Sequence, residues 1–149
     1  MAVTMHQVVV ELDRDEPRYD VLARFGPAAL PHLRLIVGAD DPLRAAKAAY
    51  AASLIAGPAS LKVLNAAADH PDPQVRVAVA HGLQNRSESA PDALLEHLLD
   101  DSDVGVRKVA LGSAGTVSSP QLRRKIAAMA EDDPQEFVRN LAANVRDQP

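Results

Sequence analysis

A motif made of an acidic residue, a turn and an apolar residue followed by arginine recurs four times along this chain of 149 residues. Its arginines are Arg44, Arg76, Arg107 and Arg139, which are separated by 32 (76−44), 31 (107−76) and 32 (139−107) residues. A repeat period of about 20–50 residues is typical of a solenoid, in which similar units stack and bury a continuous core. The motif therefore predicts a stack of similar supersecondary units.

Prolines and capping residues predict that each unit is a pair of helices. Proline suits the first helical position because the N–H that it lacks would be unpaired there, and a preceding Asp or Ser accepts a bond from a free N–H. Asp41, Asp72 and Ser119 each directly precede a proline, and Asp133 and Glu136 have the spacing of a capping box. Eight prolines fall where a helix should begin: Pro17, Pro27, Pro42, Pro58, Pro73, Pro91, Pro120 and Pro134. We expect ten helices and no strands, at about residues 4–13, 17–25, 27–37, 42–56, 58–69, 73–85, 91–100, 103–114, 119–131 and 134–146.

Equivalent positions in the first helices of the pairs define an apolar stripe. Its three rows are Leu43, Val75, Val106 and Val138; Ala46, Ala78, Val109 and Leu141; and Tyr50, Gly82, Ser113 and Val145. The i, i+3, i+7 spacing predicts that these rows are buried, and the small Gly82 and Ser113 predict close approach of a neighbouring helix. The N-terminal helix has its own apolar stripe, from Met5, Val8, Val9 and Leu12.

Two segments resemble short HEAT-like repeats of the type also found in phycobilin lyase subunits. Residues 25–33 (FGPAALPHL) resemble the turn into the second helix of such a repeat, and residues 72–80 (DPQVRVAVA) resemble the opening of the next one. The resemblance covers about residues 17–146. It implies an all-α fold, a right-handed α-solenoid of about five helix pairs in a single domain (1–149), with a capping helix at about 4–13. First helices would lie outside, and second helices would line a concave face.

The resemblance also implies a ladder of charges between repeats. Its members would be Asp41, Asp72, Asp103 and Asp133 together with Arg44, Arg76, Arg107 and Arg139. Charged residues that recur once per repeat normally satisfy loop backbone and neighbouring charges, so we expect a structural role for them. The adjacent aspartates at 40–41, 100–101 and 132–133 are interpreted in the same way, as helix starts rather than catalytic pairs.

Composition narrows the functional classes. The net charge of −4 and the pI near 5.7 argue against a general nucleic-acid binder, which usually has a basic domain or stripe. The absence of Cys excludes disulfides and thiolate metal sites and favours a cytoplasmic location. The sequence has no signal-peptide pattern and no apolar run long enough for a membrane span.

No catalytic or metal-binding motif stands out. None of the five His is followed by Glu, which argues against a di-iron centre of the deoxyhypusine hydroxylase type, and no metal or cofactor is expected. Mixed charge and the lack of Trp argue against a DNA glycosylase of the alkylpurine type. The segment 101–105 (DSDVG) starts like a calcium loop, but Gly112 stands where that loop requires Glu. A relative of the bilin lyases remains open.

The favoured function is a non-catalytic scaffold that binds a protein through its concave face. Candidate contact residues are those expected on the solvent side of the second helices: His32, Arg34, Lys62, Asn65, Glu96, His97, Arg124 and Lys125. The alternative is nucleic-acid binding through a local basic patch, formed by Arg34, Lys62, Arg123, Arg124 and Lys125. Either end of the solenoid could also stack on a second copy, because solenoid ends need polar caps to stay soluble.

Overall fold

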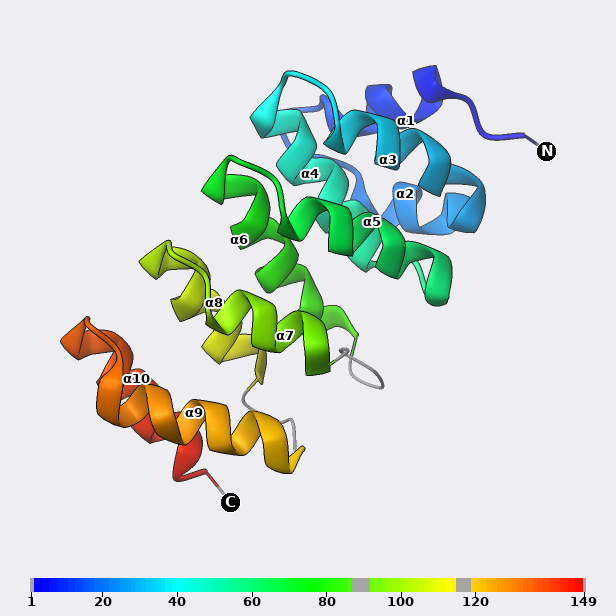
Figure 1. Ribbon diagram of the computed structural model, residues 1–149. Coiled ribbons are helices and arrows are strands. Elements are labelled where there is room, and N and C mark those ends of the chain that lie inside the picture. The colour runs from blue at the N-terminus through cyan, green and yellow to red at the C-terminus, as the bar shows by residue number, and fades with distance from the viewer. Residues whose placement is uncertain (1, 87–91, 115–118, 149) are drawn as a thin grey trace.

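Helices account for the architecture throughout the part of the chain that the computed structural model describes, residues 2–86, 92–114 and 119–148 (Figure 1). The ten expected helices are present there, and no strand is. They are α1 (Met5–Leu12), α2 (Tyr19–Phe25), α3 (Leu30–Val37), α4 (Pro42–Ser53), α5 (Pro58–Ala68), α6 (Pro73–Gly82), α7 (Asp92–Leu99), α8 (Val104–Ala114), α9 (Pro120–Asp132) and α10 (Glu136–Arg146). Short 3₁₀ turns, η1 (Gly26–Ala29) and η2 (Leu83–Asn85), precede α3 and follow α6.

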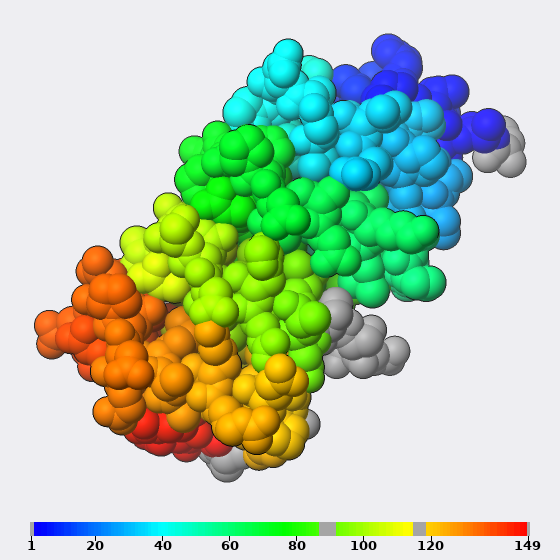
Figure 2. Space-filling view, in the orientation of Figure 1, coloured from blue at the N-terminus to red at the C-terminus, as the bar shows by residue number. Residues whose placement is uncertain are grey.

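These helices stack in two layers. The first-helix layer consists of α4, α6, α8 and α10, and the second-helix layer consists of α3, α5, α7 and α9 (Figure 1). Within each layer a helix contacts the next one along the chain. Figure 2 shows the result, an elongated body in which the repeats succeed one another from the N-terminal to the C-terminal end. The predicted α-solenoid is confirmed, whereas its right-handed twist stays a prediction.

The helix starts follow the predicted capping chemistry in most places. The side chains of Asp41, Asp72 and Ser119 accept from backbone N–H groups in the first turns of α4, α6 and α9. Thr4 and Gln7 form a complete capping box at α1. Two proline predictions are wrong, because α2 and α10 begin two residues after Pro17 and Pro134. The prediction for Pro91 falls outside the described residues.

The buried stripe of the first helices is confirmed in α6, α8 and α10 but is wrong at its first member. Val75, Val106 and Val138 have no exposed surface, whereas Leu43 is 61% exposed and Ala45 is the fully buried residue of that turn. Arg44 follows its N-cap by three residues, but Arg76 and Arg107 follow theirs by four. Aligning the repeats on arginine therefore shifts the register of α4.

The remaining rows of the stripe are closer to the surface. Ala46, Ala78, Val109 and Leu141 are half-buried and pack against the core, as do Val145 and Met5 and Val9 of α1. Gly82 and Ser113 are buried, and Val8 and Leu12 are fully so. A Cβ atom on Gly82 would lie 2.6 Å from the Cβ of Ser53, and the Ser113 hydroxyl donates to the carbonyl of Ala80. The predicted close approach between first helices is thus confirmed.

The register can be tested by truncating valines. We expect Val75→Ala and Val106→Ala each to lower the free energy of unfolding by about 1–3 kcal/mol, because each removes two fully buried methyl groups. Leu43→Ala is the control and should stay within about 0.5 kcal/mol of the parent, as exposed substitutions usually do. Urea unfolding followed by circular dichroism measures all three. Near-neutral results at both valines would refute the register.

Candidate functional site

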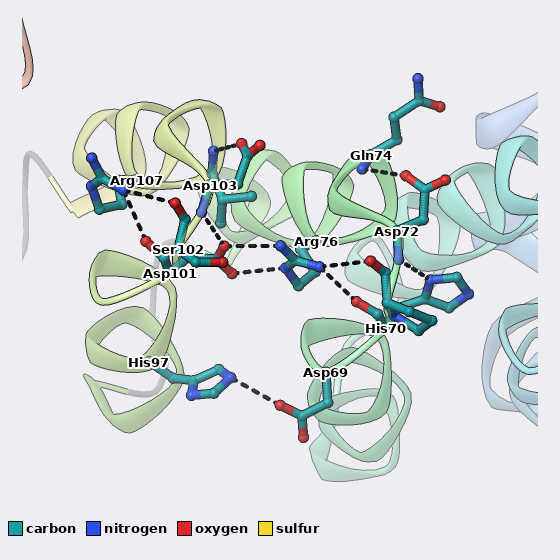
Figure 3. Close-up of polar contacts among 12 residues, drawn as sticks. Asp69, His70, Asp72, Gln74, Arg76, His97, Asp101, Ser102, Asp103 and Arg107 are labelled. Atoms are coloured by element: carbon teal, nitrogen blue, oxygen red, sulfur yellow. Dashed lines mark hydrogen bonds and ion pairs between the residues drawn. The ribbon is translucent and has the colours of Figure 1, made fainter. Parts of the chain in front are cut away.

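The most conspicuous polar cluster lies at the turns that join successive helix pairs, and Arg76 is its centre (Figure 3). Its Nε and Nη2 atoms donate to the two carboxylate oxygens of Asp101 at 2.8 and 3.0 Å. Its Nη1 atom donates to the carbonyls of His70 and Pro71 at 2.8 and 3.2 Å. One guanidinium therefore joins its own turn to the turn of the next repeat.

Arg107 repeats this geometry one unit further along. Nε and Nη2 donate to the carboxylate of Asp133 at 2.9 and 3.1 Å, and Nη1 donates to the carbonyls of Asp101 and Ser102 at 3.0 and 3.3 Å. The side chain of Asp133 is only 4% exposed and that of Asp101 only 7%. These are two equivalent, nearly buried bidentate ion pairs, which is the geometry in which arginine binds carboxylate most specifically.

The carboxylates of Asp101 and Asp133 also accept hydrogen bonds from the backbone of their own turns. Asp101 accepts from the backbone N–H of Asp103, and Asp133 accepts from the backbone N–H of Gln135. In the preceding turn the Nδ1 atom of His70 accepts the equivalent bond from Asp72 at 3.0 Å. His70 therefore occupies the position that Asp101 and Asp133 occupy later in the chain.

The predicted ladder is thus corrected in its pairing. Asp41, Asp72 and Asp103 are N-caps. The carboxylate of Asp133 pairs with Arg107 and not with Arg139. It does not cap α10 either, because the N-cap of that helix is Gln135. Arg139 donates only to the carbonyl of Asp133, at 2.7 Å. Arg44 lies outside the ladder and reaches back to Asp13 of the α1–α2 connection, at 2.7 and 2.9 Å, where both side chains are about 40% exposed.

Sequence reasoning placed Asp101 at a helix start and missed its pairing with Arg76. A signal was present, because Asp101 and Asp133 are 32 residues apart (133−101), within one residue of the interval of 31 between Arg76 and Arg107 (107−76). Burial raises the pKa of each of these carboxyls, but the arginine bonds and the backbone N–H bonds more than offset it, so that both pKa values lie below the ordinary range. Both groups are therefore held ionised as structural anions.

The eight second-helix candidates differ in exposure and in their contacts within the chain. Three are engaged within the chain: His32 bonds the carbonyl of Val3 at 2.7 Å, His97 contacts Asp69 at 2.9 Å, and Lys125 pairs with Asp100. Four are exposed and take part in none of the ion pairs found among the described residues: Arg34, Lys62, Asn65 and Arg124. Glu96 is half-buried. All eight lie on second helices, namely α3, α5, α7 and α9, and their role in binding stays a prediction.

Two open depressions lie beside the ladder. One, of about 390 Å³, is lined by Asp69, Arg76 and His97 among others, and the other, of about 310 Å³, by Arg107, Lys125 and Met129 among others. Each lies in a turn region between successive repeats, and the charged groups that line it are largely paired with one another. In the described segments no three His, Asp or Glu side chains are grouped so that they could hold a metal ion. Nor does any helix there have the length and apolar character of a membrane span.

Comparison with protein families agrees with this architecture. A family model described as HEAT repeats matches residues 61–145, which is more than half of the chain and includes both buried ion pairs. The comparison with curated proteins found no match. Alternating first and second helices, closely packed small residues and a once-per-repeat Asp–Arg contact all lie in the matched region, and the chain belongs to the HEAT-repeat family.

Proposed function

We propose that the chain is a non-catalytic, cytoplasmic scaffold that binds a partner protein. HEAT repeats commonly serve as protein-interaction scaffolds. The observation that carries the proposal is that two sets of polar side chains differ in their contacts. The once-per-repeat charges of Arg76, Arg107, Asp101 and Asp133 are engaged in joining repeats, whereas outward-facing positions differ from one repeat to the next. Variation of that kind is what a specific recognition surface requires.

The scaffold function is tested by capture followed by reconstitution. The purified chain is immobilised, exposed to native host extract, and the retained proteins are identified. We expect at least one protein that rebinds when both components are pure, at a stoichiometry fixed by analytical ultracentrifugation. Failure of every retained protein to rebind in pure form would contradict the proposal.

The exposed second-helix residues are one surface on which such a partner could bind. Arg124→Glu combined with Lys125→Glu should weaken binding of the reconstituted partner, because exposed cations steer and select acidic surfaces. The fold should persist, since Arg124 is exposed and Lys125 pairs only with the exposed Asp100. Differential scanning fluorimetry and a binding titration decide the matter. A collapsed melting temperature would make the pair structural, and unchanged binding would remove this surface from the proposal.

A further inference from the structure

Three adjacent first helices of this acidic chain contain basic side chains and no acidic ones. The chain as a whole has a net charge of −4, yet α4, α6 and α8 contain no Asp or Glu. Their cationic residues are Arg44, Lys47, Arg76, Arg107 and Lys108. The neighbouring aspartates at their N-termini are N-caps, whose carboxylates accept from backbone N–H groups at the edge of the layer. Beyond their capped N-termini, these three helices therefore present cationic side chains without acidic neighbours on the same helix.

Two of these cations are available to a ligand. Arg76 and Arg107 are held by buried carboxylates, and Arg44 is paired with Asp13. Lys47 and Lys108 take part in none of the ion pairs found among the described residues; Lys108 is exposed and Lys47 is half-buried. They lie at neighbouring rather than equivalent positions of their repeats: Lys47 precedes Tyr50 by three residues, and Lys108 precedes Gly112 by four.

A row of rings crosses α2, α4 and α6 and ends one helix before α8, which carries Lys108. Tyr19 of α2 meets Tyr50 of α4 edge to face, with ring centroids 4.9 Å apart, and Tyr50 stacks on His81 of α6 at 5.5 Å. Tyr50, His81 and Gly112 follow at intervals of 31 residues (81−50 and 112−81). The next place in the row is therefore an exposed glycine, where an added Cβ would come no closer than 3.7 Å to the nearest atom, the amide nitrogen of Gln84.

The first-helix layer also presents apolar surface. Leu43 and Phe137 are 61% and 49% exposed, and they are two of the four strongly exposed large apolar side chains among the described residues.

The first helices form the more tightly packed layer of the stack, because they contact one another more extensively than the second helices do. Closer contact between successive helices is expected in the inner layer of a curved stack. It favours the first helices as the concave side, whereas the expectation from the sequence was that the second helices lie there.

We propose that the first-helix face, defined by Lys47, Tyr50, Val77, His81, Lys108 and Gly112, binds an extended acidic segment of a partner protein. Lys47 and Lys108 bind carboxylates of the segment, and an apolar or aromatic side chain of the segment lies over His81 and Gly112. Two helix spacings of about 8–10 Å separate the lysines, and an extended chain covers that distance in about five or six residues. The inference rests on the proposed scaffold function and names its ligand class.

A protein segment fits this face better than a nucleic acid does. Phosphates follow one another at every nucleotide, so a nucleic-acid site normally has a dense row of cations. Here the two available lysines lie on helices that are two places apart, and the chain's overall negative charge repels a polyanion. Widely spaced carboxylates with an apolar group between them match the face.

The test is selection of random dodecapeptides on the intact chain, followed by titration of the selected peptides in synthetic form. We expect the selected sequences to be enriched in Asp and Glu, five or six residues apart, around an aromatic or large apolar residue. Lys47→Glu with Lys108→Glu should weaken their binding at least tenfold, because like charges would then face one another. The matched control, Arg24→Glu with Arg146→Glu, reverses two charges that lie on neither candidate surface and should stay within twofold of the parent.

A second variant separates shape from charge. Gly112→Gln fills the open place beside His81 without adding charge, and it should weaken peptide binding several-fold while raising helix propensity. Circular dichroism and melting curves confirm that each variant is folded. Selected peptides without acidic enrichment, or equal binding by the Lys47→Glu/Lys108→Glu variant, would overturn the inference.

The remaining outcomes distinguish the inference from the scaffold proposal. Peptide binding that is lost only in the Arg124→Glu/Lys125→Glu variant would overturn the inference and leave the scaffold function standing. The same holds if no peptide is enriched while a host protein is captured and rebinds. A twenty-nucleotide DNA strand that binds more tightly than any peptide, and depends on Lys47 and Lys108, would replace the protein ligand with a nucleic acid.

Discussion

Replacing Arg107 with alanine is expected to lower the free energy of unfolding by about 3–5 kcal/mol, the usual cost of removing one partner of a buried ion pair. The substitution leaves the carboxylate of Asp133, which is 4% exposed, without its cationic partner. It also leaves the carbonyls of Asp101 and Ser102 without the donor that now satisfies them. Much of the effect is therefore the penalty of a buried charge rather than the net strength of the pair.

Arg44→Ala is the matched control for this experiment. Arg44 belongs to the same sequence motif and also forms a bidentate contact with an aspartate, but both of its partners are about 40% exposed. Water screens such a pair, so the loss should be far smaller than at Arg107. Chemical denaturation of both variants makes the comparison, and equal losses would show that burial does not set the strength of the ladder.

The pH dependence of the Arg107 effect has a definite sign. Folding lowers the pKa of Asp133, so this carboxyl stabilises the parent above its unfolded pKa of about 3.9 and loses that contribution as pH falls through the folded pKa. In Arg107→Ala the same carboxyl is buried without its arginine, and protonation then relieves the fold. The difference between parent and variant should shrink between pH 7 and about pH 3. A difference that grows on acidification would contradict the assigned role of Asp133.

The helix pairs were predictable because their signals are local. A cap such as Asp72 followed by Pro73 fixes where a helix begins through the chemistry of adjacent residues. The buried stripe was predictable for a similar reason, because helical spacing places Val75 and Val79 on one side of α6. Leu43 was misplaced because the spacing from the N-cap Asp41 to Arg44 is one residue shorter than in the other repeats. Aligning the repeats on the arginine hides that difference.

The ladder partners were not predicted from local patterns, because they are set by how far a side chain reaches across a repeat boundary. Arg76 passes over its own cap, Asp72, and meets Asp101, which is 25 residues away in the sequence (101−76). Nothing in the local pattern distinguishes a cap carboxylate from a cross-repeat carboxylate. For the same reason the ring row was missed, since Tyr19, Tyr50 and His81 meet only when three repeats are stacked.

Leu98→Ala is expected to destabilise the chain by about 2–5 kcal/mol, the range measured for truncation of buried leucines. Leu98 is fully buried in α7, which packs against α5, α6, α8 and α9. Leu35→Ala is the control, because Leu35 is the same residue type on the second-helix layer but is 66% exposed. Its effect should stay within about 0.5 kcal/mol.

Position in the stack should decide how far the damage of a core truncation spreads. A solenoid is stabilised by contacts between neighbouring repeats, so loss of packing in a central helix weakens the coupling on both sides. Leu12 is equally buried but lies in α1, at the N-terminal end of the described stack. Hydrogen exchange should therefore accelerate on both sides of α7 in Leu98→Ala, but mainly in α1 to α4 in Leu12→Ala. Uniform acceleration along the chain in both variants would mean that the repeats unfold as one cooperative block.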